Sequence, residues 1–157
     1  MVLITVDPGL GGTGYAVFDS EGPGAVPPVD FGVLHARRGD WRARAHGLRR
    51  AFWAQCQVHV PIDRVVIEFP ELFVSNAKST ASASKGNLFQ LTYLVGLLGA
   101  TAADYTGEPP ELITPREWKG QLPKEVVIRR LMRAYGHEYS SHAADAVGIG
   151  LHLQGGL

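Results

Sequence analysis

The sequence contains little cysteine and no excess of charge. Its 157 residues include a single cysteine and equal numbers of acidic and basic residues. One cysteine cannot form an internal disulfide, and no charged start followed by an apolar leader opens the chain. Hydrophobic residues make up 45% and charged residues 19% of the chain, which excludes a disordered, collagen-like or coiled-coil protein. We expect one domain over residues 1–157, in a cytoplasmic protein.

Lysine and arginine are absent from the first 36 residues, which carry four acidic residues. Residues 37–64, in contrast, contain seven arginines and two acidic residues. A basic segment on a neutral chain can bind a polyanion, because local patches rather than net charge make the contacts with phosphate. A solvated helix face explains the same arginines equally well.

One stretch raises the question of a membrane span. Residues 86–103 form a run of 18 residues without a charge. Polar side chains such as Asn87 and Gln90 dilute this run, and its three glycines suit close helix packing rather than lipid. We therefore expect a central buried helix and no membrane partner.

The sequence has no nucleotide-binding motif in the structural context that such a motif requires. Gly9, Gly11 and Gly14 spell G-x-G-x-x-G, but residues 15–18 that follow are strand-forming, whereas a dinucleotide site needs this loop to open a helix. The Walker pattern is absent from the sequence. We expect no nucleotide cofactor.

The apolar pattern predicts alternating strands and helices. Strands are expected at 2–6, 13–18, near 31–35, 64–68 and 112–114. Helices are expected after Asp40, over 79–104, from Pro123 to Gly136 and over 142–153. The inward residues are Trp41, Ala45, Leu48, Phe52 and Cys56 in the first helix and Val127, Leu131 and Ala134 in the third. The fold class is α/β, a mixed five-stranded sheet with helices on both faces.

Acidic residues stand at the ends of buried elements. Asp7 ends the first strand and Glu68 the fourth, while His142 and Asp145 share one face of the last helix. Buried carboxylates need a cationic partner. Three carboxylates and an imidazole are suitable ligands for two divalent cations acting on a phosphodiester. For each acid alone, a cap or an arginine pair is an equally good explanation.

The same residues resemble the motifs of the RuvC-type Holliday junction resolvases, which belong to the RNase H-like superfamily. The matching segments are VDPGLxxTG at 6–14, IE at 67–68 and HAADA at 142–146. The resemblance implies an RNase H-like fold, a homodimer and paired nicking of four-way DNA junctions. It also implies that Asp7, Glu68, His142 and Asp145 are catalytic and bind two Mg²⁺ ions, with Mn²⁺ also supporting activity. Segments 67–70 and 118–124 are more similar to phage-encoded relatives.

Further residues are candidates for contact with DNA. Phe69 and Phe73 follow the second acid, where members of this family place an aromatic wedge, although the same loop could pack as ordinary core. Basic candidates are Arg49, Arg50, Lys78, Lys85, Lys119 and Lys124. Trp118 is expected to be a core anchor rather than a base-stacking residue.

Two other functions are compatible with the motifs. One is a different RNase H-like nuclease, acting on branched DNA, flaps or RNA in the manner of YqgF-like proteins. The other is a junction-binding protein that does not cleave, which would have no use for buried acids. A homodimer is expected through the helix over 79–104, whose residues Phe89, Tyr93, Gly96, Leu97 and Ala100 are not needed by the core.

Overall fold

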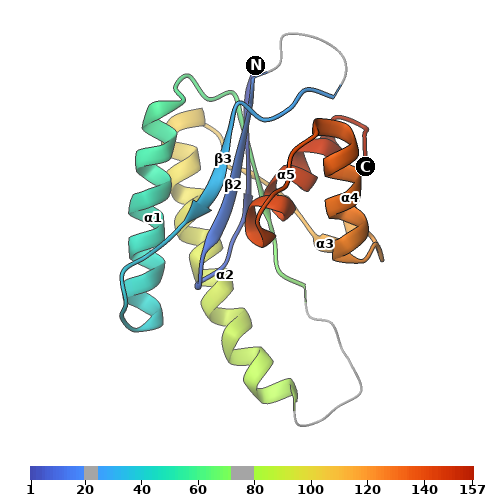
Figure 1. The fold of residues 1–157 in the computed structure, drawn as a ribbon. Helices are drawn as coiled ribbons and strands as arrows, with labels where there is room; N and C mark the ends of the chain where they lie inside the picture. The colour runs from blue at the N-terminus through green and yellow to red at the C-terminus, as the bar shows by residue number, and fades with distance from the viewer. Residues whose placement is uncertain (20–24, 72–79) are drawn as a thin grey trace.

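A twisted sheet lies between two groups of helices in the computed structural model of this chain (Figure 1). The structure describes residues 1–19, 25–71 and 80–157, except the side chains of 80–85. The strands are β1 (Val2–Asp7), β2 (Thr13–Asp19), β3 (Asp30–Leu34), β4 (Arg64–Glu68) and β5 (Glu111–Ile113). The helices are α1 (Trp41–Val58), α2 (Thr80–Thr106), α3 (Pro115–Trp118), α4 (Lys124–Tyr135) and α5 (Ser141–Leu153).

The five strands form one mixed sheet in the order β3-β2-β1-β4-β5. The hairpin of β1 and β2 and the pair of β2 and β3 are antiparallel, whereas β4 pairs in parallel with both β1 and β5. Strands β1, β3, β4 and β5 therefore all end at the same edge of the sheet. The expected mixed five-stranded sheet is confirmed.

Helices cover both faces of this sheet, as expected, because alternate strand residues point to opposite sides. Ile4 and Val6 of β1 pack with α1 and α2 in one buried cluster. Leu3 of β1 and Val66 of β4 pack with α3, α4 and α5 in the other. Figure 1 shows the same division, with α1 and α2 on one side of the strands and the last three helices on the other. None of the helices in the described part of the chain is long and apolar enough to cross a membrane.

One short helix was missed from the sequence, and one residue was wrongly predicted to face inward. The short helix α3 was not expected, although Thr114 and Glu117 form a capping box at its start. Ala134 is exposed rather than inward. The buried stripe of α4 instead follows a spacing of four residues through Val127, Leu131 and the half-buried Tyr135, and Ala134 lies one position off that line.

Candidate active site at the carboxyl edge of the sheet

Two acidic residues end neighbouring parallel strands on the same side of the sheet. Asp7 closes β1 and Glu68 closes β4, and the register pairs Val6 with Ile67 just before them. Since Val6 and Ile67 face α1 and α2, the alternation of side chains turns Asp7 and Glu68 toward α5. Asp7 is only 7% exposed.

Helix α5 brings two more functional side chains to this edge. The Thr5 hydroxyl donates a 2.7 Å hydrogen bond to the carbonyl of Ala146, which ties α5 to β1. The start of α5 lies directly over Gly14 of β2, where a Cβ would overlap the His142 carbonyl. This close approach places His142 and Asp145, one turn apart, over the ends of β1 and β4.

Asp7 and His142 interact directly. Nδ1 of His142 lies 3.1 Å from Oδ2 of Asp7. Burial raises the pKa of Asp7 above its ordinary value, against the lowering effect of this hydrogen bond, and the charge of Asp145 raises it further. The hydrogen bond to Asp7 raises the pKa of His142. The histidine therefore compensates part of the negative charge at the end of β1.

Glu68 is held by a tryptophan from the unexpected helix. The indole Nε1–H of Trp118 donates a 2.6 Å hydrogen bond to Oε2 of Glu68. Trp118 is only 2% exposed and fits against Gly148 of α5, where a Cβ would lie 2.7 Å from its ring. Burial, and then the charge of Asp7, raise the pKa of Glu68 to about 7.

Two lysines neutralise the third carboxylate. Nζ of Lys124 donates a 2.8 Å hydrogen bond to Oδ2 of Asp145 and another of 2.6 Å to the hydroxyl of Ser141. Nζ of Lys119 lies 3.9 Å from Oδ1 of Asp145 and 4.7 Å from the centre of the Trp118 ring. Both lysines therefore lie at the site. The sequence analysis named them as candidates for contact with DNA.

The donor chemistry of this cluster fits a hard divalent cation. Three carboxylates and one imidazole meet at one edge, where burial first and then the neighbouring negative charges raise the pKa of Asp7 and of Glu68. In the described part of the chain, however, no three His, Cys, Asp or Glu side chains are arranged so that they could hold a metal ion together. Asp145 and Glu68 are instead turned to the lysines and to Trp118.

The other predicted DNA contacts are scattered. Phe69 is half-buried against the cluster beneath α1 and α2, and its backbone N–H donates to the carbonyl of Ile113. Arg49 is half-buried and Arg50 exposed on α1. Phe73, Lys78 and the side chain of Lys85 lie outside the described residues.

Sequence reasoning missed two contacts that shape the site. The expectation that Trp118 is a core anchor is confirmed by its burial, but its hydrogen bond to Glu68 crosses 50 positions of sequence and carries no local pattern. The hydroxyl of Ser141, which accepts from Lys124, was not among the predicted site residues. The capping box of residues 114–117 was a readable sign of the helix that carries Trp118.

The strand order and the two layers of helices define an RNase H-like α/β fold. Among solved structures, the chain is similar to RuvC of Thermus thermophilus. The TM-score is 0.71 and the identity 21%, and the match covers 97% of this chain and 92% of that one. The same protein in complex with a Holliday junction substrate gives a TM-score of 0.73 at 20% identity, with the same coverage. The resemblance predicted from the sequence is thus confirmed for the fold. No family model matches the sequence, and no curated protein matches it either.

Proposed function

We propose that this protein is a metal-dependent endonuclease that resolves four-way DNA junctions by paired hydrolysis of two phosphodiester bonds. The observation that carries the proposal is the convergence of Asp7, Glu68, His142 and Asp145 from three separate elements at one edge of an RNase H-like sheet. The solved complex of the similar RuvC protein contains a Holliday junction, which supports the choice of substrate.

The four converging side chains are the proposed ligands of two divalent cations, Mg²⁺ or Mn²⁺. When bound, such ions stabilise negative charge on the attacking and leaving oxygens of a phosphodiester. Carboxylate oxygens suit both ions, and imidazole favours Mn²⁺. No serine, cysteine or lysine nucleophile is needed, and Cys56 is buried on α1 away from this edge.

The remaining residues of the site position these groups and balance their charge. Trp118 fixes the direction of the Glu68 carboxylate through its N–H, so that less side-chain freedom is lost when the site is filled. Lys119 and Lys124 bring two positive charges to the rim of the site, next to Asp145. There they can attract a DNA phosphate and stabilise the extra negative charge of the transition state.

Paired cleavage requires two active sites, and we propose that a homodimer supplies them. Two sites related by a two-fold axis match the near two-fold symmetry of a four-way junction. The strip expected to form the contact is accessible on α2, where Phe89, Tyr93, Gly96 and Ala100 are exposed and Leu97 is half-buried.

Cleavage of labelled DNA tests the proposal. We expect Mg²⁺-dependent nicking of a four-way junction at symmetric positions, and much weaker cutting of duplex, flap and RNA–DNA hybrid substrates of the same sequence. Asp7→Asn should abolish nicking and keep junction affinity within a few fold, because ligand loss removes metal rather than DNA contacts. Asp19→Asn is the matched control, since Asp19 ends β2 at the opposite edge and is exposed.

Each other outcome assigns the protein differently. Equal cutting of flaps or hybrids would make it a general RNase H-like nuclease. Tight junction binding by the wild type without any cleavage would make it a binding protein. Nicking by Asp7→Asn at the rate of Asp19→Asn would remove Asp7 from the catalytic centre.

A further inference from the structure

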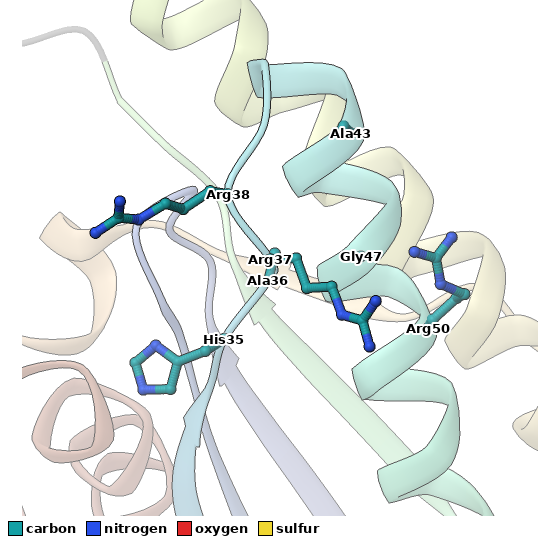
Figure 2. A pocket seen from close by; sticks show the side chains of 7 residues that line it. All are labelled: His35, Ala36, Arg37, Arg38, Ala43, Gly47 and Arg50. Carbon is teal, nitrogen blue, oxygen red and sulfur yellow. The ribbon is translucent and has the colours of Figure 1, made fainter.

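A hollow lined by arginines lies beside the proposed active site, between the end of β3 and the first half of α1. It has a volume of about 500 Å³ and is lined by His35, Ala36, Arg37, Arg38, Ala43, Gly47 and Arg50 (Figure 2). Arg37, Arg38 and Arg50 are all exposed. No acidic residue is among the described residues that line the hollow, so its described walls do not compensate the positive charge of these arginines.

These arginines have no partner among the residues that the structure describes. None of the three makes an ion pair or a hydrogen bond with a described side chain. The acid nearest in sequence, Asp40, is occupied by the backbone N–H of Ala43 at 2.8 Å and by Arg42 at 3.5 Å. Arginines that are close together and unpaired repel one another, which favours an anionic ligand. The planar guanidinium group matches phosphate in particular.

Close packing of the backbone brings Arg37 and Arg38, on the link between β3 and α1, near the helix that carries Arg50. A Cβ on Gly47 would lie 3.0 Å from the Cβ of Ala36, so the link between β3 and α1 can approach the helix closely only because residue 47 has no side chain. Figure 2 shows Arg37 and Arg50 pointing to one side of this link, and Arg38 and His35 to the other.

The turn between β1 and β2 connects the hollow to the proposed active site. A Cβ on Gly12 would lie 3.5 Å from Cε1 of His35, and a Cβ on Gly9 would lie 3.4 Å from Cε1 of His142. The turn therefore lies between the two histidines. Strands β1 and β3 end at the same edge with β2 between them, which separates the two places by roughly 10 Å, or two strand spacings.

The walls of the hollow indicate which anion it binds. Apart from the exposed imidazole of His35, its described lining residues offer no ring on which a base could stack, and its small residues are two alanines and a glycine. A phosphate on a continuous strand needs neither a base pocket nor an enclosure. Successive phosphates of one strand are at least about 3.4 Å apart, their spacing along the helix axis, so a separation of roughly 10 Å spans at most about three nucleotides.

We propose that this hollow binds a backbone phosphate of the DNA strand, within about three nucleotides of the phosphodiester at the active site. The inference rests on the proposed function, because the DNA strand must pass Asp7 for the distance to apply. It adds Arg37, Arg38 and His35 to the DNA-binding surface and gives Arg50 a specific phosphate, while the half-buried Arg49 contributes little.

The test combines charge removal on the protein with charge removal on the DNA. Binding of a labelled four-way junction and of a linear duplex is measured without divalent cations, as a function of salt, for wild type and Arg37→Ala/Arg38→Ala. We expect the variant to bind about tenfold more weakly and to lose about one to two units of the salt slope.

Single neutral methylphosphonates at successive positions around the nick then locate the phosphate. A substitution at one position within about three nucleotides of the nick should weaken binding by the wild type and have no further effect on Arg37→Ala/Arg38→Ala. The matched control is Arg130→Ala/Arg133→Ala, which removes two arginines from another hollow on α4, of about 590 Å³. This control should respond to the methylphosphonate as the wild type does.

The outcomes separate this inference from the proposed function. If the wild type cuts junctions but the two double variants behave alike at every position, the hollow does not bind the strand. If the arginine effect holds while the wild type cuts nothing, the hollow is a DNA site and the nuclease proposal fails. Absence of binding to junction and duplex alike would overturn both.

Discussion

Burial of acidic side chains is the dominant effect at the scale of single residues. It raises the pKa of Asp7, and it raises the pKa of Glu68 to about 7, with the neighbouring negative charges adding to the effect. Each of these groups binds its proton more tightly in the folded than in the unfolded chain. Folding stability is therefore greatest below the unfolded pKa values and is lost as the pH rises through the folded ones.

The first prediction concerns this pH dependence in the absence of metal. Between about pH 4.5 and 7 the melting temperature should fall by a few degrees as Glu68 ionises, and Glu68→Gln should flatten the fall. Thermal unfolding in the presence of EDTA measures this. Mg²⁺ or Mn²⁺ should stabilise the wild type more at pH 8 than at pH 5. An equal pH slope for wild type and Glu68→Gln would show that the burial of Glu68 does not limit stability.

A second prediction concerns the choice of metal at His142. Imidazole suits Mn²⁺ better than Mg²⁺, so we expect a relative gain of activity with Mn²⁺. His142→Asp should keep substantial activity and shift the preference toward Mg²⁺. Rates in the two metals measure the shift, and His137→Ala, which changes an exposed histidine just before α5, is the control. If His142→Ala cleaves like wild type in both metals, His142 is not a ligand.

At the scale of elements, the packing of α5 on β2 determines whether the site exists. Gly14 lets the first turn of α5 lie against the strand, because a Cβ there would overlap the carbonyl of His142. Gly11 lies in the adjoining turn and has nothing within 4 Å of a Cβ. The two glycines thus provide a matched pair of positions: an added Cβ would clash with α5 at Gly14 and would meet no neighbour at Gly11.

We therefore expect Gly14→Ala to destabilise the fold by about 1–3 kcal/mol and to reduce cleavage strongly, because α5 carries His142 and Asp145 away from Asp7. Gly11→Ala should be neutral in both respects. Urea unfolding and junction cleavage measure the two effects. Equal behaviour of the two variants would mean that the approach of α5 to β2 is not needed for activity.

At the scale of the whole molecule, the exposed strip on α2 is the proposed surface for a second copy. Phe89 is 74% exposed there, and Tyr93 is 40% exposed. Tyr93 also contacts α1, with its hydroxyl 2.9 Å from Nε2 of His46 and its ring edge-on to Trp41. An apolar strip of this kind on one face of a helix is typical of an interface.

Sedimentation tests the assembly directly. We expect the wild type to sediment as a dimer of twice 17.0 kDa and Phe89→Asp as a monomer with little paired nicking. Met132→Asp is the control, since Met132 is 45% exposed on α4 and lies outside the strip. A wild type that remains monomeric on junction DNA would contradict both the dimer and the paired mechanism.

Much of the fold and the positions of the acids could be predicted from local sequence. Asp7 and Glu68 each follow an apolar run whose alternation fixes which side of the sheet they face, and the spacing of His142 and Asp145 puts them on one helix face. The helix α3 escaped prediction because a single turn has no periodicity, and Ala134 was misplaced by one position on its helix.

The sequence by itself determined the five strands, the four longer helices and the four residues proposed to carry the chemistry, because these depend on neighbours a few positions away. Only the tertiary structure decided the partners of those residues. Trp118 reaches Glu68, and Lys124 reaches Asp145. The physical reason is that these contacts join residues brought together by the packing of helices on the sheet, and no short-range pattern in the chain encodes which side chains then meet.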